Sequence, residues 1–550
     1  MKRIVNALGK LNWGKRAYAV VVLCATAPIA LPAQTLTTLH SFNGPDGDSP
    51  EAALIQGVDG DGYGTTFYGG ASSGGTNCYP KGCGTVFKIT PSGTLTTLYS
   101  FCSQSGCTDG AYPAAAPIQG TNGNFYGTTF GGGANGDGTV FKMTPSGTVT
   151  TLYNFCSQSD CTDGSQPTAS LLQAANGDFY GTTDWGGSGN DGTVFRLTPS
   201  GTLTTLHSFA LTDGAQPYAG LIQATDGNFY GTTFGGGVVN DQACPTGCGT
   251  VFRITPSGNL STLYIFCAQT NCADGANPRS ALFQAANGDF YGTASLGGNA
   301  RPWVSCGTIF KITYSGTLTT LYSFCSEGYP ECTDGAIPYA GLVRATDGDF
   351  YGTTNQGGLG HEGTIFSITL AGQLTTLFHF GGGAFGGDPE AGLIQATSGD
   401  FYGTTYQGGA PLDGVNVVAA MPRFQRYGPY ATTTIKYGTV FRLSVGLGPF
   451  VKTQPTSGKV GAAVKILGAD LTGASSVTFN GTAATFTVNS TGAAISTTVP
   501  AGATRRRGSG SDAPCHVIEQ RAVPGVITGS AFRAEVRRVP PVPPRSGSEE

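Results

Sequence analysis

Charged residues are scarce in this chain of 550 residues. They make up 11% of it and leave a formal net charge of −4, whereas an average soluble protein has roughly 25% charged residues. Because the chain has no basic surplus, we expect neither a nucleic acid nor an anionic membrane as a partner. Long apolar runs are missing too, since the stretch Ala17–Ala30 falls short of the roughly 20 residues that a membrane helix needs. The mature chain is therefore predicted to have no transmembrane segment.

Catalytic signatures are also sparse. The chain has 5 histidines, and neither a Ser-His-Asp elbow nor a cluster of metal ligands emerges around them. Gly-rich stretches such as Gly131–Gly133 lack the Lys-Ser/Thr step and the following helix of a phosphate loop. We therefore expect no metal, no cofactor and no enzymatic activity. An enzyme built from scattered carboxylates stays open as an alternative, because a fold alone does not set a function.

Residues 1–34 are typical of an export signal. Lys2, Arg3 and Lys10 form a basic start, an apolar segment follows, and Ala33 offers a small residue for cleavage. We expect the protein to be secreted or held at the bacterial cell surface.

Cysteine usage agrees with an oxidising compartment. No cysteine pair is accompanied by a second pair at zinc-ribbon spacing or by nearby histidines, so local disulfides are favoured over metal sites. Six pairs are close in sequence: Cys78/Cys83, Cys102/Cys107, Cys156/Cys161, Cys244/Cys248, Cys267/Cys272 and Cys325/Cys332. Cys306 stands before Gly-Thr, as Cys83 and Cys248 do, but has no nearby partner in the sequence. We expect Cys306 to be a free thiol.

Glycine is abundant, with 88 residues, and one phrase recurs seven times. A Tyr-Gly-Thr step begins at Tyr63, Tyr126, Tyr180, Tyr230, Tyr291, Tyr351 and Tyr402. A Gly-Thr-Val/Ile-Phe run ends at Phe87, Phe141, Phe195, Phe252, Phe310, Phe366 and Phe441. A third element, Leu/Val-Ser/Thr-Thr-Leu, begins at Leu36, Leu95, Val149, Leu203, Leu260, Leu318 and Leu374. The third element precedes the first step and has no copy after the last Phe, which suits a ring closed by its leading strand.

Each repeat predicts four short antiparallel strands. Asp-Gly or Asn-Gly between two apolar runs is a strong hairpin signal, because these residues accept positive φ. Four strands in a unit as long as the spacing between successive Tyr-Gly-Thr steps match a propeller blade. The fold class expected is all-β: a seven-bladed β-propeller over residues 35–446, in which Leu36–Phe42 pairs beside Gly438–Leu443 and completes the last blade.

The repeats resemble the GloVer-type tandem repeat of "choice-of-anchor" secreted bacterial proteins. The matching phrases are Asp/Asn-Gly-x-Phe-Tyr-Gly-Thr-Thr, Gly-Thr-Val-Phe-Lys-Ile-Thr-Pro-Ser-Gly and Leu-Thr-Thr-Leu-Tyr-Ser-Phe, over residues 36–443. This resemblance implies export and surface attachment. It implies no established catalytic activity, so no functional residue is carried over from it.

The sequence after the repeats differs in character. Residues 447–504 are similar to a partial IPT/TIG module, an immunoglobulin-like β-sandwich, through Pro455–Gly458, Val477–Phe479 and Val499-Pro500. The sequence then changes to Arg505-Arg506-Arg507 and a Pro/Arg-rich tail. We expect the module to lack its last strands, and residues 505–550 to be disordered.

Candidate ligand-binding residues follow from the ring. Loops between the second and third strands, and between successive repeats, vary in length and share one end of a propeller, where binding usually evolves. Two tryptophans there, Trp185 and Trp303, are candidates to stack on sugars, and Arg344 breaks a row of glutamines in the innermost strands. A carboxylate recurs before the innermost strand at Asp109, Asp163, Asp213, Asp274 and Asp334. These aspartates attract a cation or basic ligand if they converge, and accept hydrogen bonds from their own turns if they do not.

The sequence favours a non-catalytic, monomeric binding or adhesion protein that uses the variable-loop end, with a glycan or another cell-surface component as its partner. A propeller enzyme, either a glycoside hydrolase or a lyase acting on polysaccharide or cell-wall material, is the first alternative. A structural surface-layer component is the second.

Overall fold

The structure is a computed structural model. It describes residues 34–71, 78, 81–237, 244–298, 306–328, 331–409, 437–454, 460–479, 481–503, 526–529 and 534–538. The predicted export signal lies outside these residues, apart from Gln34. None of the helices among the described residues has the length and apolar character needed to span a membrane.

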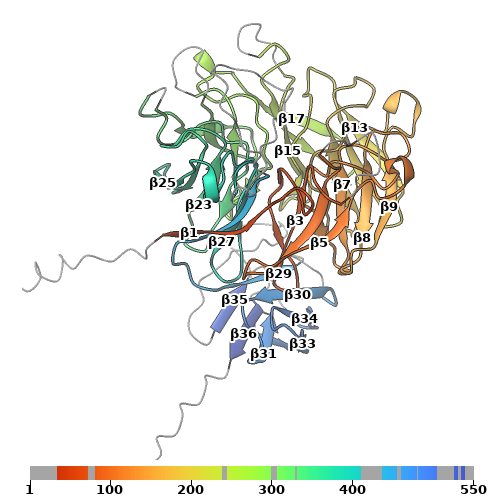
Figure 1. Cartoon of the computed structure of the whole chain (residues 1–550), viewed down its shortest axis with the longest axis vertical. Helices are drawn as coiled ribbons and strands as arrows, with labels where there is room; N and C mark the ends of the chain where they lie inside the picture. The colour runs from red at the N-terminus through yellow and green to blue at the C-terminus, as the bar shows by residue number, and fades with distance from the viewer. Residues whose placement is uncertain are drawn as a thin grey trace, which may run out of the picture.

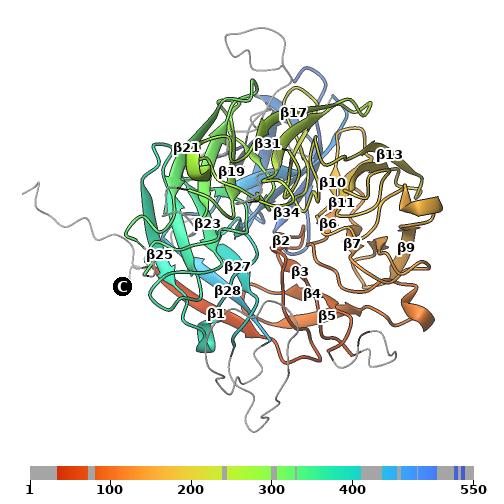
Figure 2. The ribbon, with the colours of Figure 1, turned by 90° about the horizontal axis from the view of Figure 1, so that it is seen from above.

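The described part of the repeat region forms seven four-stranded antiparallel sheets, which surround a common axis (Figure 2). Nearest the axis lie β2 (Ile55–Gln56), β6 (Ile118–Gln119), β10 (Leu172–Gln173), β14 (Ile222–Gln223), β18 (Phe283–Gln284), β22 (Val343–Arg344) and β26 (Ile394–Gln395). Next come β3 (Gly62–Thr66), β7 (Phe125–Thr129), β11 (Phe179–Thr183), β15 (Phe229–Thr233), β19 (Phe290–Ala294), β23 (Phe350–Thr354) and β27 (Phe401–Thr405).

The third position in each sheet holds β4 (Thr85–Ile89), β8 (Thr139–Met143), β12 (Thr193–Leu197), β16 (Thr250–Ile254), β20 (Thr308–Ile312), β24 (Thr364–Ile368) or β28 (Thr439–Ser444). The rim holds β5 (Leu95–Ser100), β9 (Val149–Asn154), β13 (Leu203–Ser208), β17 (Leu260–Ile265), β21 (Leu318–Ser323), β25 (Leu374–His379) and β1 (Thr35–Ser41). Short 3-10 turns follow four rim strands: η1 (Ser105–Cys107), η2 (Ser159–Cys161), η3 (Thr270–Cys272) and η4 (Gly383–Phe385). We number the sheets 1 to 7 from β2–β5 to β26–β28 with β1. The all-β prediction is confirmed.

The leading strand completes the last sheet, as the phase of the repeats predicts. β1 pairs with β28 from Thr35 opposite Ser444 to Ser41 opposite Thr439. Neighbouring sheets are also joined by side chains, since the first Thr of each Tyr-Gly-Thr step donates to a carbonyl of the following sheet at 2.9–3.2 Å. In this series Thr404 of sheet 7 donates to Ala52 O of sheet 1. The leading strand therefore belongs to the seventh sheet, and a side-chain hydrogen bond joins this sheet to the first.

Aromatic rings fill the space between sheets. The Tyr of one Tyr-Gly step lies against a Phe of the next sheet, for example Tyr180 against Phe229 with ring centroids 4.1 Å apart. The glycine beside this Tyr is required by a close approach: a Cβ on Gly181 would lie 2.6 Å from the Phe195 ring. Such aromatic pairs contribute about 0.5–1.5 kcal/mol each beyond their buried area. The repeated Tyr-Gly step thus specifies both a ring for the neighbouring sheet and room for a ring of its own.

The C-terminal segment forms a second unit of two four-stranded sheets. One contains β29 (Val451–Gln454), β30 (Ala463–Gly468), β34 (Ala494–Thr498) and β33 (Phe486–Val488). The other contains β32 (Thr482–Ala484), β31 (Ala474–Phe479), β36 (Ala534–Arg538) and β35 (Val526–Gly529). A core that includes Ile466, Val477 and Ile495 is buried between them.

β35 and β36 lie in the segment for which the sequence predicted disorder. β36 pairs with β31 from Ala474 opposite Arg538 to Phe479 opposite Ala534. An open strand edge is a template for any chain that reaches it, and the pairing occupies that edge of β31. These two strands also supply β-structure that the sequence predicted to be missing from the module. The remainder of residues 505–550 lies outside the described part of the chain.

Candidate functional site

The two ends of the ring differ in what covers them. The C-terminal unit packs on the end that carries the short hairpin turns (Figure 1). There Asn489 Nδ2 donates to Val58 O at 2.9 Å, and Phe450 N donates to Thr397 O at 3.0 Å. A cavity of about 250 Å³ remains between the two units beside these contacts. We call this end the closed end, and the opposite end, where the repeats connect to one another, the open end.

At the closed end the innermost glutamines join the sheets. Each Gln oxygen accepts the backbone N–H of a turn residue in the preceding sheet, as in Val58 N to Gln119 Oε1 at 3.0 Å. The series continues through Gln173, Gln223, Gln284 and Gln395, and closes where Thr397 N of sheet 7 donates to Gln56 Oε1 at 3.1 Å. The candidate residue Arg344 stands in this row and donates through Nε to Gly348 O at 3.3 Å. A guanidinium has no acceptor, so Arg344 cannot make the bond to the preceding sheet.

The five candidate aspartates do not come together. Asp109 accepts the Tyr99 hydroxyl at 2.7 Å and the Ser103 backbone N–H at 2.9 Å. Asp163, Asp274 and Asp334 accept the matching hydroxyls of Tyr153, Tyr264 and Tyr322, and Asp213 pairs with His207 Nε2 at 3.0 Å. Every partner side chain named here belongs to the rim strand that directly precedes its aspartate in the chain. These contacts fix the turn after each rim strand and hold the carboxylates away from a shared ligand.

At the open end one backbone feature recurs in all seven repeats. The residue before each proline has a positive φ of 51–59°: Ser49, Tyr112, Gln166, Gln216, Asn277, Ile337 and Asp388. Its N–H donates to a carbonyl just before the third strand of the preceding sheet, as in Ile337 N to Cys306 O at 2.7 Å. Residues other than Gly rarely adopt this conformation, because it costs roughly 1–2 kcal/mol. The repeated strain sets the position of the proline and of the residue that follows it.

That following residue differs from repeat to repeat. The seven are Glu51, Ala114, Thr168, Tyr218, Arg279, Tyr339 and Glu390, each four residues before an innermost strand. Because the innermost strands surround the axis (Figure 2), these residues meet at the open end of the ring. We call them, together with Asp184 and Tyr406, the axial cluster.

Arg279 is the centre of this cluster. Its guanidinium lies 4.3 Å from the ring centroid of Tyr339 in sheet 6 and 5.3 Å from that of Tyr218 in sheet 4. Both contacts are in the range of cation–π attraction. The Tyr218 ring in turn meets Phe234 edge-on at 5.3 Å. Residues of three successive sheets thus hold one cation between two aromatic rings.

Carboxyl groups from other sheets lie within the electrostatic reach of Arg279. Asp184 is 2% exposed and accepts the Thr168 hydroxyl at 2.7 Å. Burial raises the pKa of Asp184 to about 8, although the Thr168 hydroxyl and the Arg279 charge act in the opposite direction. Burial also raises the pKa of Glu390, again against the Arg279 charge. A large part of the Asp184 population is therefore uncharged at neutral pH and able to donate a hydrogen bond.

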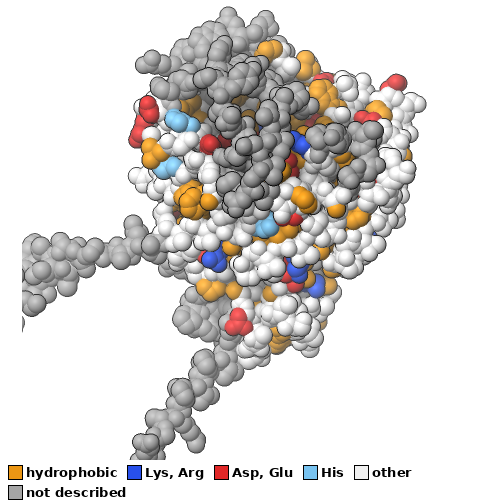
Figure 3. Space-filling view, viewed as in Figure 1, with side chains coloured by type: hydrophobic (Ala, Val, Ile, Leu, Met, Phe, Trp, Pro, Cys, Tyr) orange, Lys and Arg blue, Asp and Glu red, His pale blue; other side chains and the backbone are white. Residues whose placement is uncertain are grey.

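A separate aromatic group lies in sheets 1 and 2, and Tyr406 of the axial cluster lies in sheet 7. Phe67 stacks on Tyr112 at 5.3 Å and lies 6.1 Å from Phe130. Burial raises the pKa of the Tyr406 phenol, and the negative charge of Glu51 adds to this shift. The open end thus combines flat aromatic faces with a few polar groups, as ligand sites commonly do. Figure 3 shows the side of the molecule, where the charged side chains of the described residues are few and scattered.

Of the two candidate tryptophans, the structure describes Trp185. Trp185 directly follows Asp184 in the chain and is 37% exposed. Trp303 lies outside the described residues.

The cysteines that the structure describes lie in the connections at the open end. All six predicted pairs lie at disulfide distance. The expectation that Cys306 has no nearby partner is wrong, because Cys306 also lies at disulfide distance from Cys325. These two residues are far apart in sequence but close in space, since they flank the paired ends of β20 and β21.

The sequence interpretation missed Arg279, Asp184, Glu390 and the two flanking tyrosines. A usable signal was present: the position after the repeated proline is occupied by a different residue in most repeats. Their convergence depends on ring closure and could not be inferred from any single repeat.

Comparisons with known proteins identify the repeat. The Gloeobacter/Verrucomicrobia repeat matches residues 77–300 and 241–417, which together make up more than half of the chain. No curated protein matches the sequence.

Two similar solved structures illustrate the fold comparison. A fungal alcohol oxidase of the AA5 family, in complex with copper, is 12% identical with a TM-score of 0.48, over 85% of this chain and 92% of that one. A Penicillium chrysogenum α-L-arabinanase complexed with arabinobiose is 12% identical with a TM-score of 0.35, over 60% and 92%. At such values these likenesses carry nothing about substrate or activity.

Proposed function

The chain belongs to the Gloeobacter/Verrucomicrobia repeat family, and from this premise we propose that it is an exported, non-catalytic protein that binds carbohydrate at the open end of its ring. In this proposal the seven sheets are the blades of a seven-bladed β-propeller, monomeric and closed by β1. The C-terminal unit is an immunoglobulin-like module of the IPT/TIG kind.

The observation that carries the binding proposal is the setting of Arg279. Arg279 is held between Tyr218 and Tyr339. The buried carboxyl of Asp184 and the half-buried carboxyl of Glu390 lie within its electrostatic reach. None of the other six residues that follow the prolines is a cation. Features that serve only to close the ring repeat in every sheet. The axial cluster does not repeat, which favours recognition over architecture.

The chemistry of the cluster suits a sugar. A pyranose ring presents an apolar face, which packs on aromatic side chains, and hydroxyl groups, which pair with carboxyl and guanidinium groups. The exposed Trp185, which follows Asp184 in the chain, adds a further flat surface. Glycans and other surface components are also accessible to an exported protein, and the six cysteine pairs at disulfide distance agree with an oxidising compartment.

The test is a glycan-array screen of the purified protein, followed by titration of any ligand found. Arg279→Ala removes the cation at the open end, and Arg344→Ala removes the matching cation at the closed end. We expect Arg279→Ala to weaken binding at least about tenfold, which corresponds to about 1.4 kcal/mol, while Arg344→Ala changes it less than about twofold. Circular dichroism checks that both variants stay folded.

Other outcomes point to the alternatives. If Arg344→Ala weakens binding and Arg279→Ala does not, the ligand lies at the closed end and the proposal is wrong. Release of reducing sugar that disappears in Asp184→Asn or Glu390→Gln would indicate the propeller enzyme, in which a carboxyl that is protonated at neutral pH serves as a general acid. Absence of any glycan ligand would favour the surface-layer component.

A further inference from the structure

Three cysteines meet at the junction of sheets 5 and 6. Cys306, Cys325 and Cys332 have their sulfur atoms within 4.8 Å of one another. Their side chains are almost fully buried, at 3%, 6% and 4% exposure. The Cα atoms of Cys306 and Cys325 are 6.0 Å apart, and those of Cys325 and Cys332 are 4.1 Å apart. One sulfur can form only one disulfide at a time, so a thiol remains beside any bridge formed within this group.

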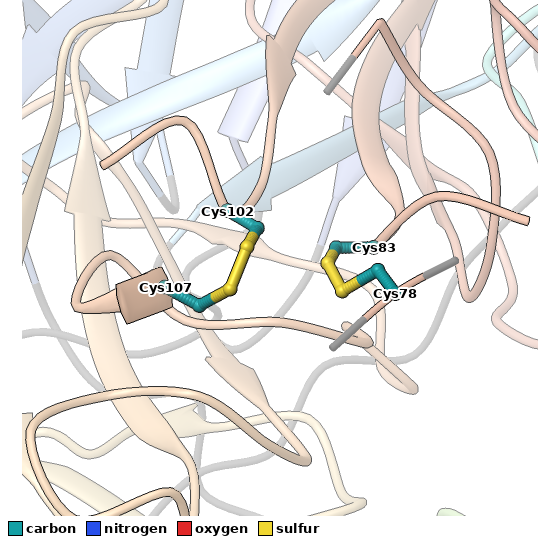
Figure 4. A group of neighbouring side chains, drawn as sticks. All are labelled: Cys78, Cys83, Cys102 and Cys107. Atoms are coloured by element: carbon teal, nitrogen blue, oxygen red, sulfur yellow. A yellow bond between two sulfur atoms is a disulfide. The ribbon is translucent and has the colours of Figure 1, made fainter. Parts of the chain in front are cut away.

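The same place in sheet 1 holds four cysteines instead of three. Cys83 and Cys102 occupy the positions of Cys306 and Cys325, before the third strand and after the rim strand. Figure 4 shows Cys83 bridged to Cys78, and Cys102 bridged to Cys107, side by side. Sheet 4 has the equivalent set, with Cys244–Cys248 next to Cys267–Cys272. In these two sheets every sulfur has its own partner.

Sheet 5 keeps one member of this arrangement without its loop partner. The segment before Cys306 contains no cysteine back to Cys272, whereas Cys83 has Cys78 and Cys248 has Cys244. The Cys306 thiol is therefore left against the Cys325–Cys332 bridge. A thiolate next to a disulfide is the arrangement in which exchange occurs.

We propose that Cys306, Cys325 and Cys332 form a thiol–disulfide exchange site, in which Cys325 is bridged alternately to Cys332 and to Cys306. The Cys306 thiol gives its proton to solvent, and the thiolate attacks Cys325 Sγ. A Cys306–Cys325 bond forms as the Cys325–Cys332 bond breaks, and the electron pair leaves with Cys332, which then takes up a proton. The step needs no external oxidant or reductant.

The two states differ in what they hold together. The Cys325–Cys332 bridge closes the connection between sheets 5 and 6 on itself, like the matching bridge Cys267–Cys272 between sheets 4 and 5. The Cys306–Cys325 bridge instead ties the start of β20 to the end of β21, whose residues Thr308 and Ser323 are already paired. Exchange therefore releases the covalent closure of the connection without opening the sheet.

The experiment maps the bridges in the full-length protein. Native protein is incubated at several pH values and then unfolded in mildly acidic N-ethylmaleimide, which blocks free thiols while exchange is slow. Trypsin cuts after Lys311 and a glutamate-specific protease after Glu327 and Glu331, so the three cysteines fall on separate peptides. We expect both bridged pairs, each with the third cysteine alkylated, and faster equilibration at higher pH because the thiolate is the nucleophile. A single bridge in all samples, or three alkylated cysteines, overturns the proposal.

Two variants test the proposal whatever the ratio between the Cys325–Cys332 and Cys306–Cys325 forms at equilibrium. Cys332→Ser is expected to bridge Cys306 to Cys325 quantitatively while keeping the native circular dichroism; a folded variant in which both are alkylated contradicts the proposal. Cys78→Ser reproduces the three-cysteine arrangement in sheet 1. Some molecules of this variant are expected to carry a Cys83–Cys102 bridge and the others the original Cys102–Cys107 bridge; if only the original bridge is found, the proposal is contradicted.

Discussion

The two ends of the ring use the same repeat in opposite ways. At the closed end six sheets place a glutamine in the innermost strand, and each of these oxygens accepts a hydrogen bond from the preceding sheet. At the open end the residue after the proline is Glu, Ala, Thr, Tyr or Arg, according to the sheet. In each of these six repeats the glutamine follows the variable residue by five positions, as Gln56 follows Glu51. Uniform residues hold the sheets together, whereas the varied ones gather different chemistry at one place.

The strained residue before each proline explains how variation is possible. Its positive φ and its hydrogen bond to the preceding sheet occur in all seven repeats, with side chains as different as Ser49 and Ile337. The backbone at the open end is therefore fixed independently of the side chains it carries. A substitution after the proline changes the chemistry of the axial cluster with little effect on the ring.

The largest expected effect comes from opening the ring. A chain that lacks Thr35–Ser41 exposes β28 and removes Leu36 and Leu39 from the clusters they pack against. Full burial of a leucine contributes about 1.5–3 kcal/mol and a backbone hydrogen bond about 0.5–1.5 kcal/mol. Leu36 and Leu39 are half-buried, and several backbone hydrogen bonds to β28 are lost with them, so we expect a loss on the order of 5 kcal/mol. Calorimetry measures the change, with a chain lacking only the residues before Gln34 as the control. Equal unfolding temperatures for the two chains would contradict closure by β1.

This closure is the part of the fold that the sequence predicts best. The phase of the Leu-Thr-Thr-Leu element alone placed Leu36–Phe42 beside the last repeat, and the Asp-Gly and Pro-Ser-Gly turns placed the hairpins. The β31 edge shows the limit of such patterns. Its partner β36 lies beyond Arg505, and no local pattern in either strand identifies the other.

The residues of the proposed binding site were harder to predict because repetition was the wrong guide to them. The recurrent aspartates drew attention, yet Asp109 and its counterparts accept hydrogen bonds from their own rim strands. Arg279 and Asp184 come from different repeats and interact only because the ring brings sheets 3 and 5 to the same axis. Cys306 was assigned no partner for the same reason, since its neighbour Cys325 lies across a strand pair.

A second effect, of comparable size across the full pH range, tests the burial of Asp184 in the axial cluster. The folded protein keeps the Asp184 proton up to about pH 8, whereas the unfolded chain releases it near 3.8. Between these values unfolding releases a proton, so the free energy of unfolding falls as pH rises, by about 1.4 kcal/mol per pH unit for one such group. Asp184→Asn keeps an acceptor for Thr168 and does not titrate.

We therefore expect the free energy of unfolding of Asp184→Asn to equal that of the parent protein at the acidic end of this range. Toward the basic end it should be increasingly higher than that of the parent, and above about pH 8 the difference should stay constant. Urea denaturation across the range measures the difference. Parallel stability curves for the two proteins would show that Asp184 is ionised in the folded state, and the account of its burial would fail.

The smallest expected effect concerns the one interruption at the closed end. Arg344→Gln restores an acceptor for the sheet before it and should raise the free energy of unfolding by about 0.5–1.5 kcal/mol, the net value of one such hydrogen bond. The reciprocal change, Gln119→Arg, removes the acceptor of Val58 N and leaves a partly buried donor, which costs about 1–3 kcal/mol. Opposite signs in urea denaturation support a structural role for this row. If instead Arg344→Gln leaves stability unchanged and weakens ligand binding, then the asymmetry at the closed end serves recognition, and the contrast between the two ends does not hold.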